Sequence, residues 1–221
     1  MRARDLERYR REIGWRDAPL LDVAAAPAAP RVESGDLESL AREAVSCTRC
    51  RLAEQRRTVV FGEGDPQARV MFIGEGPGAE EDRTGRPFVG PAGAVLDAMI
   101  FALGLERRQV YIANVVKCRP PGNRDPQDDE AAACAPFLDR QIALIRPLLI
   151  VGFGKAAARR LTGSTAPIRA LRGRWASYLG IPVLPTFHPA FLLRTPLAKR
   201  EAWQDLKAVR KRLEDATSSS S

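Results

Sequence analysis

A carboxylate inside a glycine-rich turn is the first feature of this sequence that could carry out chemistry. The run FIGEGPGAEEDRTGRPFVG, residues 72–90, passes from an apolar segment into a turn that contains Glu75, and three further acids follow it at once. Its glycines fit the dinucleotide fingerprint G-x-G-x-x-A, but a bound pyrophosphate needs helix-terminal N–H groups without negative charge. The next apolar run supplies no acid for a ribose, and no G-K-[ST] of a P-loop follows. We therefore interpret Glu75 as a group that handles a water molecule or a proton.

Four cysteines form a second candidate site. Cys47 and Cys50 are spaced C-x2-C, and Cys118 and Cys134 are spaced C-x15-C. Four thiolates suit either a [4Fe–4S] cluster or a structural zinc ion, and free buried thiols are a third interpretation. The absence of a second short pair favours an iron–sulfur cluster. Either metal site would tie the first helix of the domain to the far edge of the sheet.

The only histidine is a third candidate, because it lies where an apolar run ends in a turn bounded by proline. His188 stands in TFHPAFLLR, and no H-x-E with P-C-x-x-C accompanies it, which argues against a zinc deaminase. The apolar residues that follow, and then Arg194, fit two structures almost equally well. They predict either the start of a helix that packs on the core or a wedge that enters DNA.

These residues need elements that bring them together. Four nearly continuous apolar runs are typical of buried parallel strands, at residues 69–75, 110–118, 147–154 and 181–189. Helical segments are expected at residues 36–47, 91–104, 126–146, 154–163 and 196–215. The alternation predicts an α/β fold, a three-layer α/β/α sandwich around a four-stranded parallel sheet. Ligands bind beyond the carboxyl ends of such strands. Those ends carry Glu75, Asn114, Gly152–Gly154 and His188.

The bulk composition limits the class of protein. The 221 residues are enough for one domain, expected at residues 36–217, after an N-terminal extension and linker at 1–35 and before a disordered tail at 218–221. A net charge of +8 suits an acidic partner such as nucleic acid, although solubility is the other explanation. The charged N-terminus has no apolar core of a signal peptide, and the longest apolar stretch is too short for a membrane span. We therefore expect a cytoplasmic protein.

The motifs together resemble those of a known family. GEGPGAEED…GRPFVG, NVVKCRPPGNRDP and HPAFLLR, with the C-x2-C…C-x15-C framework, are similar to the family 4 uracil-DNA glycosylases, the iron–sulfur branch of bacteria and archaea. The resemblance covers residues 36–212. The related family 5 enzymes lack the acid in the first motif. The cross-linking relatives carry a histidine in an Arg-rich insertion, and this chain has no second histidine. Phe191 and Leu192 stand where the family usually has small residues.

The resemblance implies a monofunctional enzyme that flips uracil out of single- or double-stranded DNA, hydrolyses its N-glycosidic bond and leaves an abasic site. Phe88 would stack on the base, and the Asn114 amide would pair with the Watson–Crick edge of uracil and mismatch cytosine. His188 would donate to the carbonyl oxygen on which negative charge develops. Strand cleavage would need a lysine at the pocket, and Lys117, the only lysine near an expected strand end, lies beside a candidate metal ligand.

The resemblance also implies supporting residues. Glu75, with the Gly76–Pro77–Gly78 backbone, would hold and polarise the attacking water, and Glu81 and Asn123 are weaker candidates for hydrogen bonds that steady this turn. The implied wedge comprises Phe191, Leu192, Leu193 and Arg194. The implied ligands of a [4Fe–4S] cluster are Cys47, Cys50, Cys118 and Cys134. We expect a monomer associated with the nucleoid.

A second class of function remains. The chain could be an iron–sulfur accessory protein that binds a base in nucleic acid without turning it over. Glu75 and Asn114 together favour the enzyme, because a protein that only binds has no need of a carboxylate beside the water site.

Overall fold

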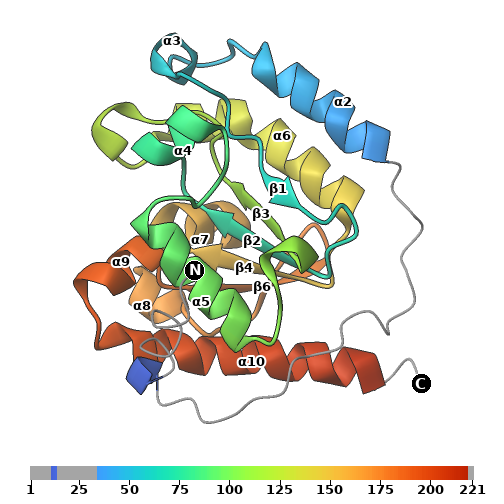
Figure 1. Cartoon of the computed structure of the whole chain (residues 1–221), viewed down its shortest axis with the longest axis vertical. Helices are drawn as coiled ribbons and strands as arrows, with labels where there is room; N and C mark the ends of the chain where they lie inside the picture. The colour runs from blue at the N-terminus through green and yellow to red at the C-terminus, as the bar shows by residue number, and fades with distance from the viewer. Residues whose placement is uncertain (1–10, 14–33, 219–221) are drawn as a thin grey trace.

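One mixed sheet organises the computed structural model, which describes residues 11–13 and 34–218 (Figure 1). Its strand order is β1-β3-β2-β4-β6-β5. The strands are β1 (Glu63–Gly64), β2 (Val70–Gly74), β3 (Tyr111–Asn114), β4 (Leu149–Phe153), β5 (Ala176–Tyr178) and β6 (Ile181–Thr186). The sequence therefore predicted the α/β class and the four central strands correctly.

The centre and the edges of the sheet differ in direction. β3, β2, β4 and β6 run parallel, as expected for strands joined by helical crossovers. β1 pairs with β3, and β5 with β6, in antiparallel fashion, so the sheet has six strands rather than the four expected from the sequence. The two edge strands contain only two and three residues, too few to show an alternating apolar pattern.

Helices cover both faces of the sheet (Figure 1). The five segments expected to be helical are helices, and the structure adds shorter ones, of which only the helix after His188 was among the expected alternatives. The helices are α2 (Ser34–Val45), α3 (Leu52–Gln55), α4 (Ala79–Thr84), α5 (Pro91–Ala102), α6 (Asp128–Ile145), α7 (Gly154–Thr162), α8 (Ile168–Leu171), α9 (Pro189–Arg194) and α10 (Ala198–Ser218), with short 3-10 turns η2 (Arg107–Gln109) and η3 (Pro121–Asn123). None of the helices in the described ranges is long and apolar enough to cross a membrane.

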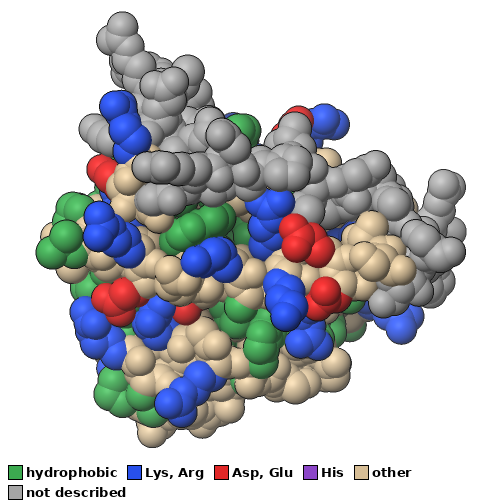
Figure 2. All heavy atoms as spheres, turned by 90° about the horizontal axis from the view of Figure 1, so that it is seen from below, with side chains coloured by type: hydrophobic (Ala, Val, Ile, Leu, Met, Phe, Trp, Pro, Cys, Tyr) green, Lys and Arg blue, Asp and Glu red, His purple; other side chains and the backbone are tan. Residues whose placement is uncertain are grey.

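The long helix α10 forms one outer face of the molecule (Figures 1 and 2). Figure 2 shows Lys and Arg side chains on this face with Asp and Glu side chains between them. Arg210 and Glu214, one helical turn apart, form an ion pair of 2.8 Å. The positive charge on this face is therefore not a continuous patch.

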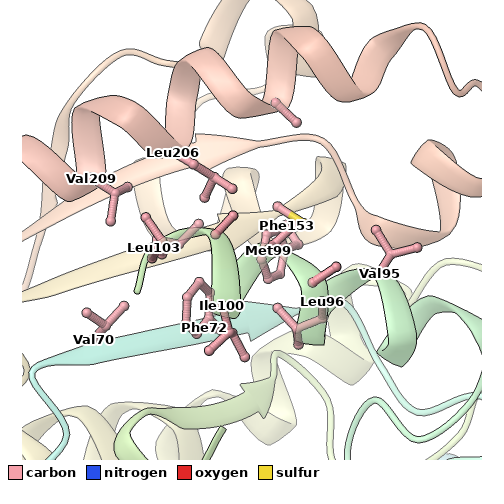
Figure 3. Packing of buried hydrophobic residues seen from close by; sticks show 14 of the residues in the cluster. Val70, Phe72, Val95, Leu96, Met99, Ile100, Leu103, Phe153, Leu206 and Val209 are labelled. Carbon is pink, nitrogen blue, oxygen red and sulfur yellow. The ribbon is translucent and has the colours of Figure 1, made fainter. Parts of the chain in front are cut away.

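Alternate residues of the central strands point into two separate cores. Val70 and Phe72 of β2 pack against α5 and α10, where Met99 and Leu206 are buried (Figure 3). Met71, the residue between them, belongs to the opposite core, under α6 and α7. A smaller cluster packs α2 on the outside of α6. The three-layer arrangement predicted from the sequence is therefore present, with α2 as an additional outer helix.

Element boundaries differ from the expected ones at the end of β3. The apolar run continues through Val115 and Val116, which are buried, but the strand ends at Asn114. The N–H groups of these two valines donate to the carbonyl oxygens of Gly74 and Glu75, at 2.9 and 3.1 Å. The chain thus follows the glycine turn out of the sheet. Of the expected N-terminal extension, residues 11–13 and 34–35 are described, and both pieces are helical, the second as the start of α2. Of the expected tail, Ser218 is the last residue of α10, and residues 219–221 lie outside the described residues.

Candidate active site

The register of β2 and β3 brings the glycine turn beside Asn114. Gly74 and Asn114 are paired at the ends of these parallel strands. A Cβ added to Gly74 would lie 2.4 Å from Asn114 Oδ1 and 2.6 Å from the Phe88 ring. Because Gly74 has no side chain, the Asn114 amide and the Phe88 ring can both lie against the end of β2.

Asn114 has the most unusual environment in this region. Its side chain is buried, and Oδ1 has no hydrogen-bond partner. Lys117 Nζ donates to the Asn114 carbonyl oxygen at 2.9 Å and also to Gln141 Oε1. These two hydrogen bonds hold the backbone of Asn114 in place. Buried polar atoms are nearly always paired, so an orphaned amide oxygen on a rigid strand end is available to a ligand.

Glu75 points at the start of α7. Its Oε1 accepts a hydrogen bond from the backbone N–H of Ala156, at 3.2 Å, in the first turn of that helix. Burial raises the pKa of the Glu75 carboxyl above its usual value of 4.5, although the N–H groups of Ala156 and Lys155 oppose the shift. The helix terminus thus orients the carboxylate, and burial makes it a stronger base.

His188 lies beside Gly154, as Glu75 does. A Cβ at Gly154 would lie 2.5 Å from Glu75 Oε1 and 3.2 Å from His188 Cβ, and the backbone there has φ +82°. His188 Nδ1 accepts a hydrogen bond from the N–H of Ala190 at 3.1 Å. Burial, together with the charge of Arg194, lowers the pKa of His188 to about 4. The imidazole is therefore neutral at physiological pH, and its proton lies on Nε2.

Phe88 forms an aromatic wall beside this histidine. The centroids of the Phe88 and His188 rings are 5.7 Å apart, at 29°. Glu81 supports the neighbouring backbone on two sides: its Oε1 accepts from the N–H groups of Val89 and Gly90, each at 2.9 Å, and its Oε2 from that of Gly78, at 3.1 Å. The geometry expected of Glu81, a hydrogen bond to the glycine turn, is thus present.

Asn123 has a different partner from the one expected. Its Oδ1 accepts a hydrogen bond from Arg119 Nε at 2.8 Å, within the same loop, although the residue lies beside the cavity. Its backbone has φ +56°, a conformation that asparagine tolerates better than most residues. Asn123 therefore shapes the loop opposite the glycine turn.

These side chains line one cavity of about 720 Å³. Glu75, Phe88, Asn114 and His188 lie on its wall, together with the 76–78 turn. A volume of this size accommodates a nucleotide-sized ligand. The wall provides an aromatic face, an amide edge, a carboxylate and a neutral imidazole N–H.

The segment after His188 is the short helix α9. The sequence had left open whether this segment packs on the core or forms a wedge that enters DNA, and the burial of its residues decides part of this question. Leu192 of α9 is fully buried in the core, so packing explains this residue. Phe191 is half-buried, with its ring centroid 5.0 Å from that of Phe187. Leu193 and Arg194 are exposed, Leu193 to 43%. A wedge made from this segment is therefore limited to its last two residues.

Three basic residues at the cavity were not expected from the sequence. Arg124, Lys155 and Arg169 lie beside it, on three different segments, together with Arg194, which was expected in the wedge. The expectation that Lys117 is the only lysine near a strand end is wrong, because Lys155 lies two residues after β4 and is exposed at the cavity. Lys155 directly follows the apolar run 147–154, so its place could have been inferred, whereas the spacing of Arg124 and Arg169 gave no signal.

The four cysteines surround a second, much smaller cavity. Among residues 11–13 and 34–218, no group of three His, Cys, Asp or Glu side chains has the arrangement of a metal site. All four cysteines nevertheless line one cavity of about 20 Å³. The backbone N–H of Lys117 donates to Cys134 Sγ at 3.3 Å, and Arg56 to Cys118 Sγ at 3.5 Å. The donor set, four thiols with N–H groups directed at two of them, fits a thiolate-bound metal or cluster.

Comparisons with known proteins agree with this arrangement. Residues 61–207 match the family model of the uracil DNA glycosylase superfamily. The chain is 46% identical over 185 residues to the type-4 uracil-DNA glycosylase of Sulfurisphaera tokodaii, covering 79% of this chain and 83% of that protein. It is 48% identical over 160 residues to the type-4 enzyme of Thermotoga maritima, covering 72% and 83%.

The type-5 relatives are more distant. The type-5 uracil-DNA glycosylase of Pyrobaculum aerophilum is 34% identical over 181 residues, covering 66% of this chain and 79% of that protein. The resemblance drawn from the motifs is therefore confirmed, and the chain belongs to the type-4 uracil-DNA glycosylases of the uracil-DNA glycosylase superfamily.

Proposed function

We propose that this protein is a DNA repair enzyme that hydrolyses the N-glycosidic bond of uracil in DNA. It flips the base into the 720 Å³ cavity, releases uracil and leaves an abasic site with the strand intact. Membership of the type-4 family supports this activity. The single observation in this chain that carries the proposal is the buried, unpartnered Oδ1 of Asn114 on the cavity wall.

Asn114 has the chemistry to select uracil. Uracil presents an N3–H donor and an O4 acceptor, which complement the amide oxygen and nitrogen of Asn114. Cytosine presents an acceptor at N3 and a donor at N4, so the same amide mismatches it at both atoms. An unsatisfied buried polar atom costs about 1–3 kcal/mol, and pairing with uracil recovers this. Phe88 supplies the face on which the flipped ring stacks.

His188 stabilises the leaving base. When the C1′–N1 bond breaks, its electron pair moves into the uracil ring and negative charge develops on the carbonyl oxygen. The hydrogen bond from Ala190 to Nδ1 leaves the Nε2–H of His188 as the donor for this oxygen. A neutral imidazole donates without having to lose a charge in the buried site, which suits a pKa of about 4.

Glu75 acts on the sugar side. Its carboxylate, oriented by the N–H of Ala156, holds the attacking water with the Gly76–Pro77–Gly78 backbone. The water oxygen bonds to C1′, the carboxylate accepts a water proton, and the uracil anion takes up a proton from solvent. The negative charge of Glu75 also stabilises the cationic sugar as it forms. Glu81 keeps the turn in place through its hydrogen bond to Gly78.

Basic side chains at the cavity hold the DNA backbone. Arg124, Lys155 and Arg169 contact phosphates in this proposal, and binding then weakens steeply with salt. Leu193, exposed next to Arg194 of the cavity wall, fills the space that the flipped base leaves. Both single- and double-stranded DNA are substrates, because the pocket contacts one extruded nucleotide.

A [4Fe–4S] cluster bound by Cys47, Cys50, Cys118 and Cys134 completes the proposal. The cluster supplies covalent links between the segment after α2, the segment after β3 and helix α6. None of the hydrolytic steps involves it. The protein acts as a monomer in the cytoplasm, associated with the nucleoid, and residues 36–217 form its catalytic domain.

The decisive experiment is base release from an oligonucleotide with a single uracil, in single- and double-stranded form. We expect free uracil and an abasic site, with no release from the matched cytosine oligonucleotide. Glu75→Gln serves as the control for a contaminating glycosylase, because its rate must fall with the same substrate. Tight binding of the uracil oligonucleotide without base release would show instead an accessory protein that only binds DNA.

A further inference from the structure

The backbone of Phe88 adopts a conformation that its own side chain disfavours. Its φ is +50°, in the left-handed region that bulky residues rarely occupy. The ring nevertheless has a fixed place, 5.7 Å from the His188 ring and 6.2 Å from that of Phe153. Such strain persists only where surrounding contacts determine the backbone. Some group must therefore hold this residue.

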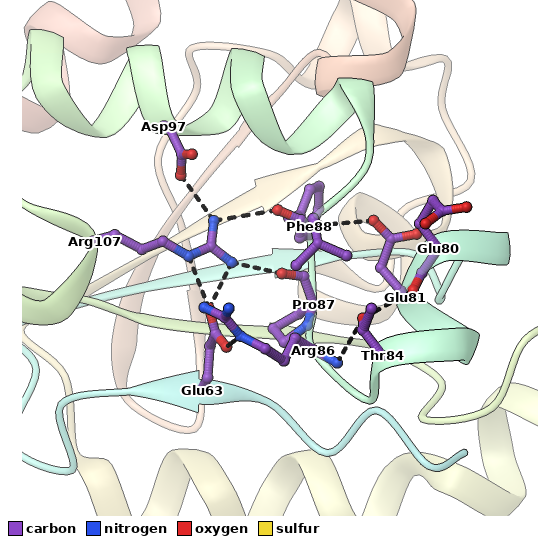
Figure 4. A network of polar contacts seen from close by, with 10 residues as sticks. Glu63, Glu80, Glu81, Thr84, Arg86, Pro87, Phe88, Asp97 and Arg107 are labelled. Carbon is purple, nitrogen blue, oxygen red and sulfur yellow. Dashed lines mark hydrogen bonds and ion pairs between the residues drawn. The ribbon is translucent and has the colours of Figure 1, made fainter. Parts of the chain in front are cut away.

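Arg107, at the start of η2, supplies that group (Figure 4). Its Nη2 donates to the Pro87 carbonyl oxygen at 2.5 Å, and its Nη1 donates to the Phe88 carbonyl oxygen at 3.3 Å. Two carboxylates hold the guanidinium from the other directions: Glu63 accepts from Nε at 2.8 Å and forms an ion pair with Nη2 at 2.7 Å, and Asp97 accepts from Nη1 at 2.8 Å. Four of the five N–H donors of the guanidinium thus form hydrogen bonds, and the ion pair with Glu63 holds the remaining side.

The opposite side of the same loop is also held. The N–H groups of Val89 and Gly90 donate to Glu81, so the carbonyl oxygens of the loop face Arg107 and its amides face Glu81. A Cβ at Gly93 would lie 1.9 Å from the Phe88 carbonyl oxygen, which shows how closely α5 approaches. Only the side of the loop that bears the ring faces the cavity.

We propose that Arg107 is a positioning residue, which fixes the Phe88 ring at the angle and depth needed to stack on the flipped base. The proposal rests on the glycosylase activity proposed above and adds a residue to it. Arg107 does not line the cavity, so it acts through Phe88 and not on the substrate. Lysine has three donors without a fixed fork and cannot hold two carbonyl oxygens and two carboxylates at once.

Arg86 provides a matched control. It forms an ion pair with the same carboxylate, Glu63, at 2.8 Å, but no contact of Arg86 reaches the carbonyl oxygens of Pro87 and Phe88. Arg86→Ala removes one positive charge from the same neighbourhood, as Arg107→Ala does. Arg107→Lys keeps the positive charge and removes only the planar guanidinium with its fixed donor geometry. It replaces Arg107→Ala as the test variant if Arg107→Ala fails to fold.

The first measurement is single-turnover excision with saturating and subsaturating enzyme, in the wild-type and Phe88→Ala backgrounds. We expect Arg107→Lys to lower the maximal rate by ~10–100-fold, because small displacements of a positioning surface have effects of this size. The enzyme concentration that gives half of the maximal rate should change little, and Arg86→Ala should match the wild type. In the Phe88→Ala background, Arg107→Lys should have no further effect. An equal loss in both backgrounds would overturn the proposal.

The second measurement does not depend on turnover. Hydrogen exchange of a peptide covering residues 84–92 should be faster in Arg107→Lys than in Arg86→Ala, while exchange elsewhere is unchanged. Unchanged exchange in this peptide would overturn the positioning role. If wild-type protein released no uracil but this peptide still responded, the proposed activity would fail while the structural role of Arg107 held, so the two failures are distinguishable.

Discussion

Nδ1 of His188 accepts a hydrogen bond from the backbone N–H of Ala190, 3.1 Å away, and this bond fixes the tautomer of the histidine in the cavity. The proton is on Nε2, the atom left to face a ligand. Because α9 begins at Pro189, the same bond caps the helix and holds the ring.

His188→Ala should therefore lower the rate of excision by ~10²–10³ with little loss of DNA affinity, because the charge that His188 stabilises exists mainly in the transition state. The measurement is single-turnover excision alongside equilibrium binding to uracil DNA. Equal losses of binding and rate would assign His188 to ground-state docking.

The pH dependence of excision should reflect Glu75. Burial raises the pKa of this carboxyl above 4.5, whereas burial lowers the pKa of His188 to about 4. As the pH falls, Glu75 takes up a proton before His188 does, so the acid limb of the rate profile has its midpoint above pH 4.5. Glu75→Gln should be slower and should lose this acid limb. Retention of the same limb in Glu75→Gln would assign it to another group.

Asn114→Asp should erode the rejection of cytosine. A protonated aspartic acid offers an O–H donor and a carbonyl acceptor, which can match the N3 acceptor and N4 donor of cytosine. The measurement is the ratio of excision rates on otherwise identical uracil and cytosine oligonucleotides, from about pH 5 to 8. Asn114→Ala is the control, because it should slow both reactions without favouring cytosine. An unchanged ratio in Asn114→Asp would remove Asn114 from base selection.

Protein purified without oxygen should be brown and contain four irons, as the thiol donor set predicts. Cys118→Ser should lower the thermal unfolding midpoint more than it lowers the excision rate of the remaining folded protein. The reason is that Cys118 lies at the small second cavity and does not line the one that contains Glu75. Stoichiometric zinc without visible absorption would favour the structural zinc site instead.

Borohydride should trap no covalent adduct with uracil DNA. Lys155 is the lysine to test, because it is exposed at the cavity, whereas Lys117 is buried against Asn114 and Gln141. Lys155→Ala should weaken DNA binding and its salt dependence while the product stays an abasic site. A trapped adduct that disappears in Lys155→Ala would show a bifunctional enzyme.

The sequence was sufficient to predict the four central, parallel strands of the sheet. Continuous apolar runs marked β2, β3, β4 and β6 because both faces of these strands are buried. The run ending β3 was too long, since Val116 is buried outside the sheet and an apolar residue reports burial rather than strand pairing. β1 and β5 were missed because two or three residues carry no period.

The residues that support the site from behind the cavity wall could not be predicted from the sequence. Arg107 stands in a charged stretch that resembles a solvated surface, and its partners Glu63, Pro87 and Asp97 lie in three separate segments. Lys155, in contrast, directly follows the apolar run 147–154, so its position at a strand end could have been inferred from the sequence. Leu192 could be read as wedge or core, and only its burial distinguishes the two.

The strand order has a consequence for synthesis of the protein. Glu75 and Asn114 follow neighbouring strands, but His188 follows β6, which joins the sheet beside β4 and is the last strand along the chain. The ribosome therefore adds His188 well after Glu75 and Asn114, and helix α10 is made later still. The full set of cavity side chains exists only once most of the chain has been translated.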